Sequence, residues 1–254
     1  MQHDVKNRGL HKTCVRLKIH NDCIVLSKLK YGDYDIIVKC YTRQHGVVSY
    51  LLKGILKSKK GKSKIVYYQV LSQLQIEENY NPSKSLHYIR EVKFNYIYKS
   101  LHINIYKSAI ALFLSEVLSK ALREEEKNET LFQYLETALQ YLDNENQFSN
   151  FHLLFLLKLT RYLGFLPHLK TDSPYFNLES GVFEVSNTGK YSISGQNLTL
   201  LKLLLGINFD SLNSVVINAK QRQEFLTILL FYFELHLEGF KKPKSIQVLN
   251  DIFR

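Results

Sequence analysis

The sequence contains little of what several common classes of protein require. Its 254 residues include no tryptophan, one methionine, four prolines and three cysteines, Cys14, Cys23 and Cys40. No two of these cysteines form a C-x-x-C pair, so they cannot build a disulfide framework or a four-cysteine zinc site. We therefore expect reduced thiols in a cytoplasmic protein, and no bound metal.

Long apolar runs are also missing. The first eighteen residues contain no continuous apolar stretch, and the most apolar run, residues 153–157, is soon interrupted by Lys158 and Arg161. A membrane-spanning helix needs about 20 consecutive apolar residues, and a signal peptide needs an apolar core of its own. The sequence thus predicts neither a signal peptide nor a membrane span.

Catalytic motifs are equally scarce. There is no G-x-S-x-G nucleophile motif, and the nine histidines are scattered along the chain. Asp33 with Asp35 and Glu77 with Glu78 are paired acids, but neither pair has beside it the further ligands of a two-metal nuclease. We therefore expect no catalytic centre and no cofactor, while a metal-dependent nuclease built on these pairs stays open as an alternative.

The positive charge is concentrated in the first hundred residues. They hold 19 lysines and arginines against 7 acids, whereas residues 101–254 hold 15 against 16. The densest group contains no acid and consists of Lys53, Lys57, Lys59, Lys60, Lys62 and Lys64. Such a run can be a merely solvated face, but its predicted place between two strands favours contact with the phosphates of a polyanion.

Part of this cluster resembles a nucleotide-binding P-loop. That motif requires four residues between its glycines and a helix immediately after it, whereas six residues separate Gly54 from Gly61. The chain is expected to continue as a strand from Ile65, which would leave no helix N-terminus for phosphates. We therefore predict a mobile basic loop that contacts backbone phosphates.

Residues 21–97 contain short runs typical of strands. Turn signals separate the five runs 23–26, 36–42, 47–52, 65–78 and 86–94. Five strands with basic loops predict an oligonucleotide-binding (OB) β-barrel, although the spacing also allows an SH3-like barrel. Tyrosines interleaved with cations are typical of single-strand binding grooves, although any one of them can be core. The candidate nucleic-acid contacts are Lys28, Lys30, Tyr31, Tyr34, Lys39 and Arg43, together with the six clustered lysines.

Residues 98–254 change to helical periodicity. Apolar spacing predicts helices over 105–121, 131–142 with Asn128 as the cap, 151–165, 198–205, 222–240 and 245–253. Residues 170–198 interrupt this pattern and read as a small hairpin insertion. The predicted architecture is therefore α+β, with an extension at 1–20, an OB-fold domain at 21–97 and a helical domain at 98–254.

Taken in order, several short motifs resemble the bacterial recombination mediator family RecO. They are Ile24-Val25-Leu26, Tyr31-Gly32-Asp33, Tyr41 to Gly46, Leu52-Lys53-Gly54 with Lys57-Ser58-Lys59, Leu131-Phe132, Phe155 to Lys158, Leu163 to Pro167, Lys244-Ser245 and Val248-Leu249. The resemblance extends over about residues 20–254.

This resemblance implies a non-enzymatic DNA repair protein of the RecF pathway in the cytoplasm, associated with the nucleoid. Its members bind and anneal single- and double-stranded DNA, bind the acidic C-terminal tail of single-strand binding protein, and load RecA together with RecR. It also assigns DNA contacts to Lys53, Lys57, Lys59 and Lys60, and suggests Lys158 and Arg161 for the acidic tail. A general OB-fold protein that binds single-stranded DNA or RNA stays open as an alternative.

The sequence departs from the family pattern in two places. Many members have a four-cysteine zinc finger after the segment that ends at Pro167, but residues 170–185 contain no cysteine. Packing of Tyr175, Phe176, Leu178 and Phe183 must then hold the hairpin. The extension at 1–18 is longer than the start of the family pattern, and we expect a disordered basic arm or a misplaced start there.

Overall fold

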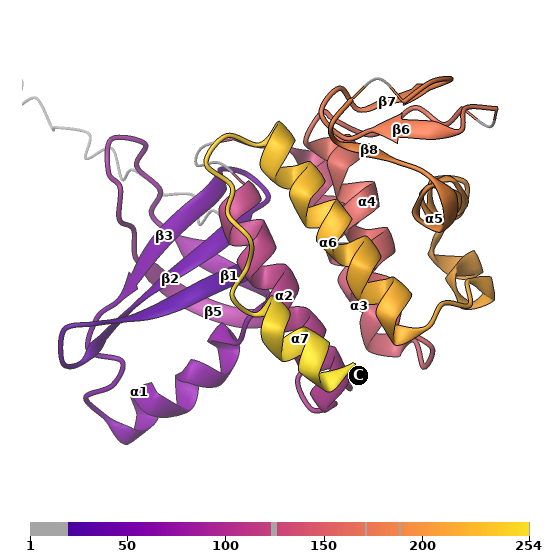
Figure 1. The fold of residues 1–254 in the computed structure, drawn as a ribbon. Helices are drawn as coiled ribbons and strands as arrows, with labels where there is room; N and C mark the ends of the chain where they lie inside the picture. Colours follow the sequence, from indigo (N-terminus) through magenta and orange to yellow (C-terminus); the bar gives the residue numbers. More distant parts are fainter. Residues whose placement is uncertain (1–19, 123–125, 171, 188, 254) are drawn as a thin grey trace, which may run out of the picture.

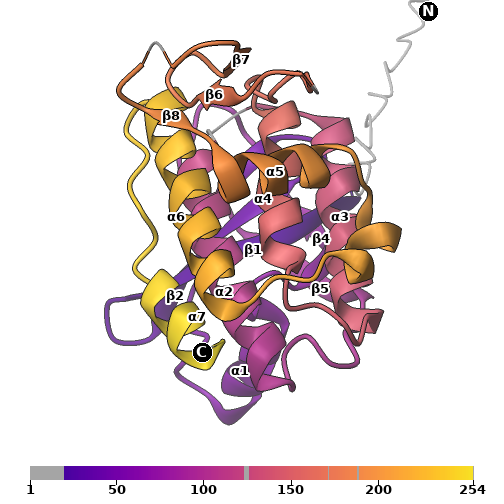
Figure 2. The ribbon, with the colours of Figure 1, turned by 45° about the vertical axis from the view of Figure 1, so that its right-hand side comes forward.

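The computed structural model describes residues 20–122, 126–170, 172–187 and 189–253 (Figure 1). The predicted N-terminal extension at 1–20 therefore lies outside the described residues except for His20, and Cys14 also lies outside them. The described chain has a sheet on one side, a group of helices on the other and a second small sheet at the far end of the helices (Figures 1 and 2). This arrangement confirms the predicted α+β class.

The first half of the chain forms an OB-like antiparallel sheet. Its strands are β1 His20–Tyr31, β2 Asp35–Thr42, β3 Gly46–Leu52, β4 Gln73–Glu78 and β5 Ile89–Tyr96. Their order is β3-β2-β1-β4-β5, so the long strand β1 pairs with both β2 and β4.

The sheet is not closed into the complete barrel that the sequence predicts. Strands β3 and β5 remain its two edges, and the segment just before β5 reaches across to β3 instead. There Tyr50 and His87 form an isolated parallel bridge, with hydrogen bonds from Leu51 N to His87 O (2.8 Å) and from His87 N to Ser49 O (3.0 Å). Closure is therefore limited to one short contact.

The lysine-rich segment is helical, which corrects both the predicted mobile loop and the strand predicted to follow it. Helix α1 spans Lys59–Ser63 and is followed by the 3₁₀ helix η1, Lys64–Tyr68, where a strand was predicted. Tyr68 is buried, Ile65 is partly buried and Val66 between them is 52% exposed. This spacing of three places the apolar side chains on one side of a 3₁₀ helix, so their apolar character alone was misleading.

Both faces of the sheet are buried at the centre of β1, over residues 23–26. One face points into the sheet's own interior and includes Cys23, Val25 and Tyr50. The opposite face contributes Ile24 and Leu26 to the same hydrophobic core as the helices. Residues 23–26 of β1 therefore read as a short continuous apolar run, as expected for a strand segment that is covered on both sides.

The second half of the chain is mainly helical. It contains α2 Ile105–Ala121, α3 Glu129–Asn144, α4 Phe151–Tyr162, α5 Gly195–Leu205, the 3₁₀ helix η2 Phe209–Ser214, α6 Ala219–His236 and α7 Ile246–Ile252. Helix α2 lies between the sheet and the other helices, and α4 is buried on nearly every side (Figure 2). Asn128 caps α3 as predicted, whereas Ile105 and Leu112 of α2 are exposed rather than buried.

The predicted hairpin insertion is a three-stranded sheet. Its strands are β6 Tyr175–Asn177, β7 Val182–Glu184 and β8 Ser192–Ile193, in the order β7-β6-β8. The rings of Phe176 and Phe183 lie 4.8 Å apart, and Phe176 also contacts Tyr232 of α6 at 5.8 Å. Of the four side chains predicted to hold the hairpin, Phe176, Leu178 and Phe183 are buried, whereas Tyr175 is only partly buried.

Candidate nucleic-acid interface

A basic groove lies between the end of β3, the helical segment α1–η1 and the beginning of β5. Its volume is about 620 Å³. The residues that line it are Leu51, Leu52, Lys53, Gly54, Ile55, Ser58, Lys60, Gly61, Lys64, Tyr67, Tyr68, Tyr88, Ile89, Arg90, Glu91 and Val92. We refer to this feature as the α1–β5 groove.

The β1–β2 turn fixes the segment that leads from β3 into the groove. Gly54 N donates a hydrogen bond to Asp35 Oδ1 (2.6 Å), and Leu56 N donates to Tyr34 O (2.9 Å). Gly54 has a φ of +66°, a left-handed conformation that glycine adopts without strain. The chain can therefore turn sharply after Lys53 and run towards α1.

Two local features then build α1. The Ser58 side chain accepts a hydrogen bond from Gly61 N (3.0 Å), which caps the helix. At Gly61 a Cβ atom would collide with Ile55 O, so only glycine allows this close approach of the backbone. Helix α1 buries none of its own residues, and its lysines are consequently free to face solvent.

The structure gathers only some of the predicted DNA contacts into the groove. Three of the six clustered lysines line it, namely Lys53, Lys60 and Lys64. The other three, Lys57, Lys59 and Lys62, are exposed nearby but do not line it. Lys28, Lys30, Tyr31 and Tyr34 are exposed at the end of β1 and in the β1–β2 turn, and Lys39 lies in the middle of β2.

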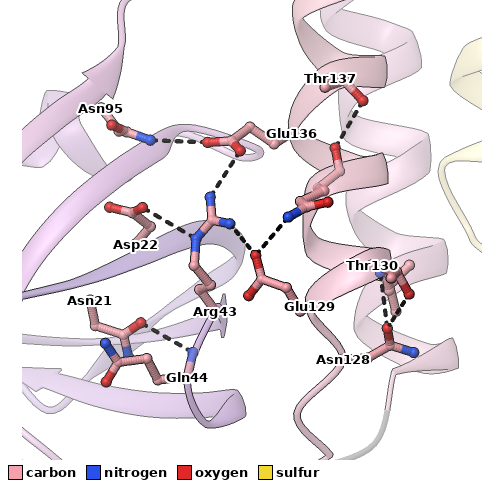
Figure 3. A network of polar contacts seen from close by, with 12 residues as sticks. Asn21, Asp22, Arg43, Gln44, Asn95, Asn128, Glu129, Thr130, Glu136 and Thr137 are labelled. Carbon is pink, nitrogen blue, oxygen red and sulfur yellow. Dashed lines mark hydrogen bonds and ion pairs between the residues drawn. The ribbon is translucent and has the colours of Figure 1, made fainter.

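Arg43 has a different environment from the other candidates (Figure 3). Its guanidinium forms ion pairs with Asp22 (3.3 Å), Glu129 (2.5 Å) and Glu136 (2.9 Å), and it lies 4.3 Å from the centre of the Phe132 ring. Glu129, Phe132 and Glu136 all belong to α3. The charge of Arg43 is therefore compensated at the contact between sheet and helices, and it contributes less to attracting a polyanion than the lysines do.

Two residues of the groove were missed by reasoning from the sequence, namely Tyr88, which directly precedes β5, and Arg90, near the start of β5. Tyr67, one of the tyrosines interleaved with cations, lies in η1, where a strand was predicted. Tyr88 and Arg90 are exposed, and Tyr67 packs on Phe94 with 4.6 Å between ring centres. The available signal was the sequence Tyr88-Ile89-Arg90, in which an aromatic and a cation flank an apolar residue within the predicted strand at 86–94.

A second pocket, of about 450 Å³, lies on the helical half. Its lining contains Lys158 and Arg161 of α4 beside the aromatic side chains of Tyr134, Tyr141, Tyr162 and Phe209, together with Thr137, Ala138, Asn208 and Asp210. Partial burial and the neighbouring charge of Arg161 both lower the pKa of Lys158. An anion bound here would relieve that repulsion. We refer to this feature as the helical pocket.

Within the described ranges, no group of three or more histidine, cysteine, aspartate or glutamate side chains could hold a metal ion. Among the same residues, no helix is both long and apolar enough to cross a membrane.

Comparison with known proteins decides the family. The family model described as recombination protein O, N terminal, matches residues 17–98, and that described as recombination protein O, C terminal, matches residues 102–245. The chain belongs to the RecO family. It is 50% identical to the DNA repair protein RecO of Christiangramia forsetii over 236 residues, which cover 92% of this chain and 99% of the relative.

Other RecO proteins are similar over almost the same length. The DNA repair protein RecO of Flavobacterium johnsoniae is 41% identical over 238 residues, covering 93% of this chain and all of the relative. The corresponding protein of Phocaeicola vulgatus is 36% identical, covering 91% and 97%. This RecO-family chain is therefore placed among the DNA repair and recombination proteins, and the predicted family is confirmed.

Proposed function

We propose that this chain is a non-enzymatic recombination mediator that acts at the bacterial nucleoid in the cytoplasm. It binds and anneals DNA and, with RecR, helps to load RecA on strands that single-strand binding protein coats. We divide it functionally into a DNA-binding OB-like part at 21–97 and a partner-binding helical part at 98–254.

The α1–β5 groove is the observation that supports DNA binding most directly. Lys53, Lys60, Lys64 and Arg90 approach it from both walls, against the single acid Glu91. Within the described part of the chain, these four cations have no carboxylate within ion-pair distance. Uncompensated cations attract DNA by releasing the counterions condensed on its phosphates.

The groove is tested by removing its lysines. The triple variant K53A/K60A/K64A should bind DNA more weakly and with a smaller dependence on salt. Each lost phosphate contact lowers the slope of log K against log salt by about 0.9 for duplex and about 0.7 for single strands. Affinity and slope are measured by fluorescence anisotropy between about 50 and 200 mM salt.

The control removes the same charge elsewhere. The variant K170A/K190A/K220A replaces three exposed lysines of the helical half and should leave the slope nearly unchanged. If both triple variants lose the same slope, net charge rather than the groove controls binding, and the assignment of the groove is wrong.

The helical pocket supports the proposed contact with single-strand binding protein. Four aromatic rings can receive an apolar side chain, while Lys158 and Arg161 can pair with acidic groups. The double variant K158E/R161E should therefore lose binding to a peptide with the acidic tail sequence of that protein and retain binding to bare DNA. Loss of stimulated annealing on coated strands, but not on bare strands, would support the mediator role.

A further inference from the structure

The α1–β5 groove has an apolar floor as well as a charged rim. Ile55 and Tyr68 are buried beneath it, and Ile89 and Val92 pack partly buried against the interior of the sheet. Phosphates and riboses gain nothing from such a surface, because they are polar and strongly hydrated. The face of a nucleic-acid base does gain from such a surface, because stacking on apolar and aromatic side chains removes the base from water.

Tyr88 provides the aromatic surface at the rim of this floor. Its side chain is 53% exposed, although it follows the buried His87 directly in the chain. An exposed ring on an otherwise well-packed segment is available to stack with a ligand. Arg90 lies two residues further along the chain, is exposed, and lines the same groove. The groove therefore presents a cation as well as an exposed ring.

The backbone before Tyr88 is held firmly. His87 is joined to β3 by two backbone hydrogen bonds, and its Nε2 contacts Asn81 O at 3.0 Å. Its ring stacks on Tyr80 with centres 4.9 Å apart and planes 9° apart, and Tyr80 in turn stacks on His45 at 3.7 Å and 3°. The backbone of Tyr88 therefore starts from a fixed position, and little backbone entropy is lost when a ligand stacks on its ring.

The size of the groove limits what can enter it. Its volume of about 620 Å³ lies within the range of about 300–1,000 Å³ that is usual for pockets of small molecules. Individual bases can occupy such a space, whereas a duplex cannot, because its bases are stacked and paired inside it. The rim lysines can contact the phosphates of either form.

We propose that the α1–β5 groove selects unpaired DNA, with one base stacked on Tyr88 and an adjacent phosphate held by Arg90. This inference rests on the proposed DNA-binding function and deepens it. The exposed lysines supply binding that does not distinguish single strands from duplex. Tyr88 adds a contribution that only an unstacked base can use, so it determines the preference for single strands.

The test compares single-stranded and duplex oligonucleotides of equal length with the full chain. Alanine substitutions of stacking aromatics cost about 1–3 kcal/mol per base, which corresponds to a loss of roughly 5- to 150-fold in affinity. The variant Y88A should lose this much for the single strand and less than about twofold for the duplex. Its salt slope should stay unchanged, because no cation is removed.

Matched variants complete the design. Y88F keeps the ring and should keep the single-strand affinity, and Y106A removes an exposed tyrosine of α2 and should change neither affinity. Equal losses for single strand and duplex in Y88A, or no loss at all, would overturn the inference while the triple lysine variant still tests DNA binding itself. A wild-type chain that binds neither form of DNA would overturn the proposed function and the inference together.

Discussion

The side chain of His152 should make folding stability depend on pH. It lies on α4, is 1% exposed and contacts the rings of Phe113 and Phe253, each with centres 6.2 Å from its own. Within the described residues, its Nδ1 atom is buried without a hydrogen-bond partner. Burial, and to a smaller extent the charge of Arg222, lower the pKa of His152 from 6.5 to about 3.

The sign of the effect follows from proton binding. Between pH 3 and 6.5 the unfolded chain binds a proton at His152 that the folded chain does not bind, so acidification favours unfolding. With these two pKa values, the stability lost at pH 5.0 relative to pH 7.5 is about 2 kcal/mol, since each unit of pH below 6.5 contributes about 1.4 kcal/mol. This stability is fully present above pH 6.5.

The assay is urea denaturation at pH 7.5 and 5.0. The variant H152L places an apolar side chain that cannot bind a proton at the same position. Its loss of stability between the two pH values should be smaller than that of the wild type by about 2 kcal/mol. The variant H168Q, which changes an exposed histidine, should behave like the wild type. If H152L and wild type lose the same stability, His152 is not kept neutral by the fold and the reasoning is refuted.

Three further predictions concern single contacts. The Glu116 carboxylate accepts hydrogen bonds from Ser245 N (2.9 Å) and Ser245 Oγ (2.6 Å). The variant E116Q should therefore weaken the docking of α7 by about 1–3 kcal/mol. The measurement is hydrogen exchange, which should become faster over residues 244–253. The variant R43A leaves three carboxylates without their partner and should cost about 1–3 kcal/mol in urea denaturation; R43K should recover only part of this, because lysine lacks the guanidinium fork. The variant G61A should weaken DNA binding without any change in charge, because its Cβ would collide with Ile55 O; an unchanged DNA affinity would show that the position of α1 does not matter.

The strands and helices that could be predicted are those whose own residues determine them. Strands β2 and β3 are short runs rich in β-branched and aromatic residues between turn signals, and Asn128 caps α3 by accepting a hydrogen bond from Leu131 N (2.9 Å). The segment Ile65–Tyr68 could not be assigned in the same way, because a short apolar run is compatible with a strand or a helix until its packing is known.

The candidate sites show the same limit. The density of lysines marked one wall of the α1–β5 groove, but Tyr88 and Arg90 reach it only because the segment before β5 bridges to β3. For Arg43, the two carboxylates that pair with it on α3 lie 86 and 93 residues further along the chain. Only the folded chain brings such distant residues together, so local patterns could not separate this arginine from the DNA-contact candidates.

The hydrophobic core shared by the sheet and the helices has a consequence for how two ligands can meet. Ile24 and Leu26 of β1 pack into the same cluster as Phe132 and Phe155 of the helices, so the α1–β5 groove and the helical pocket are carried by a single body. If the acidic tail of single-strand binding protein occupies the helical pocket, the DNA strand that this protein coats is held within a limited distance of the α1–β5 groove. Capture of that strand then becomes an intramolecular event, governed by effective concentration and therefore by avidity rather than by either affinity alone.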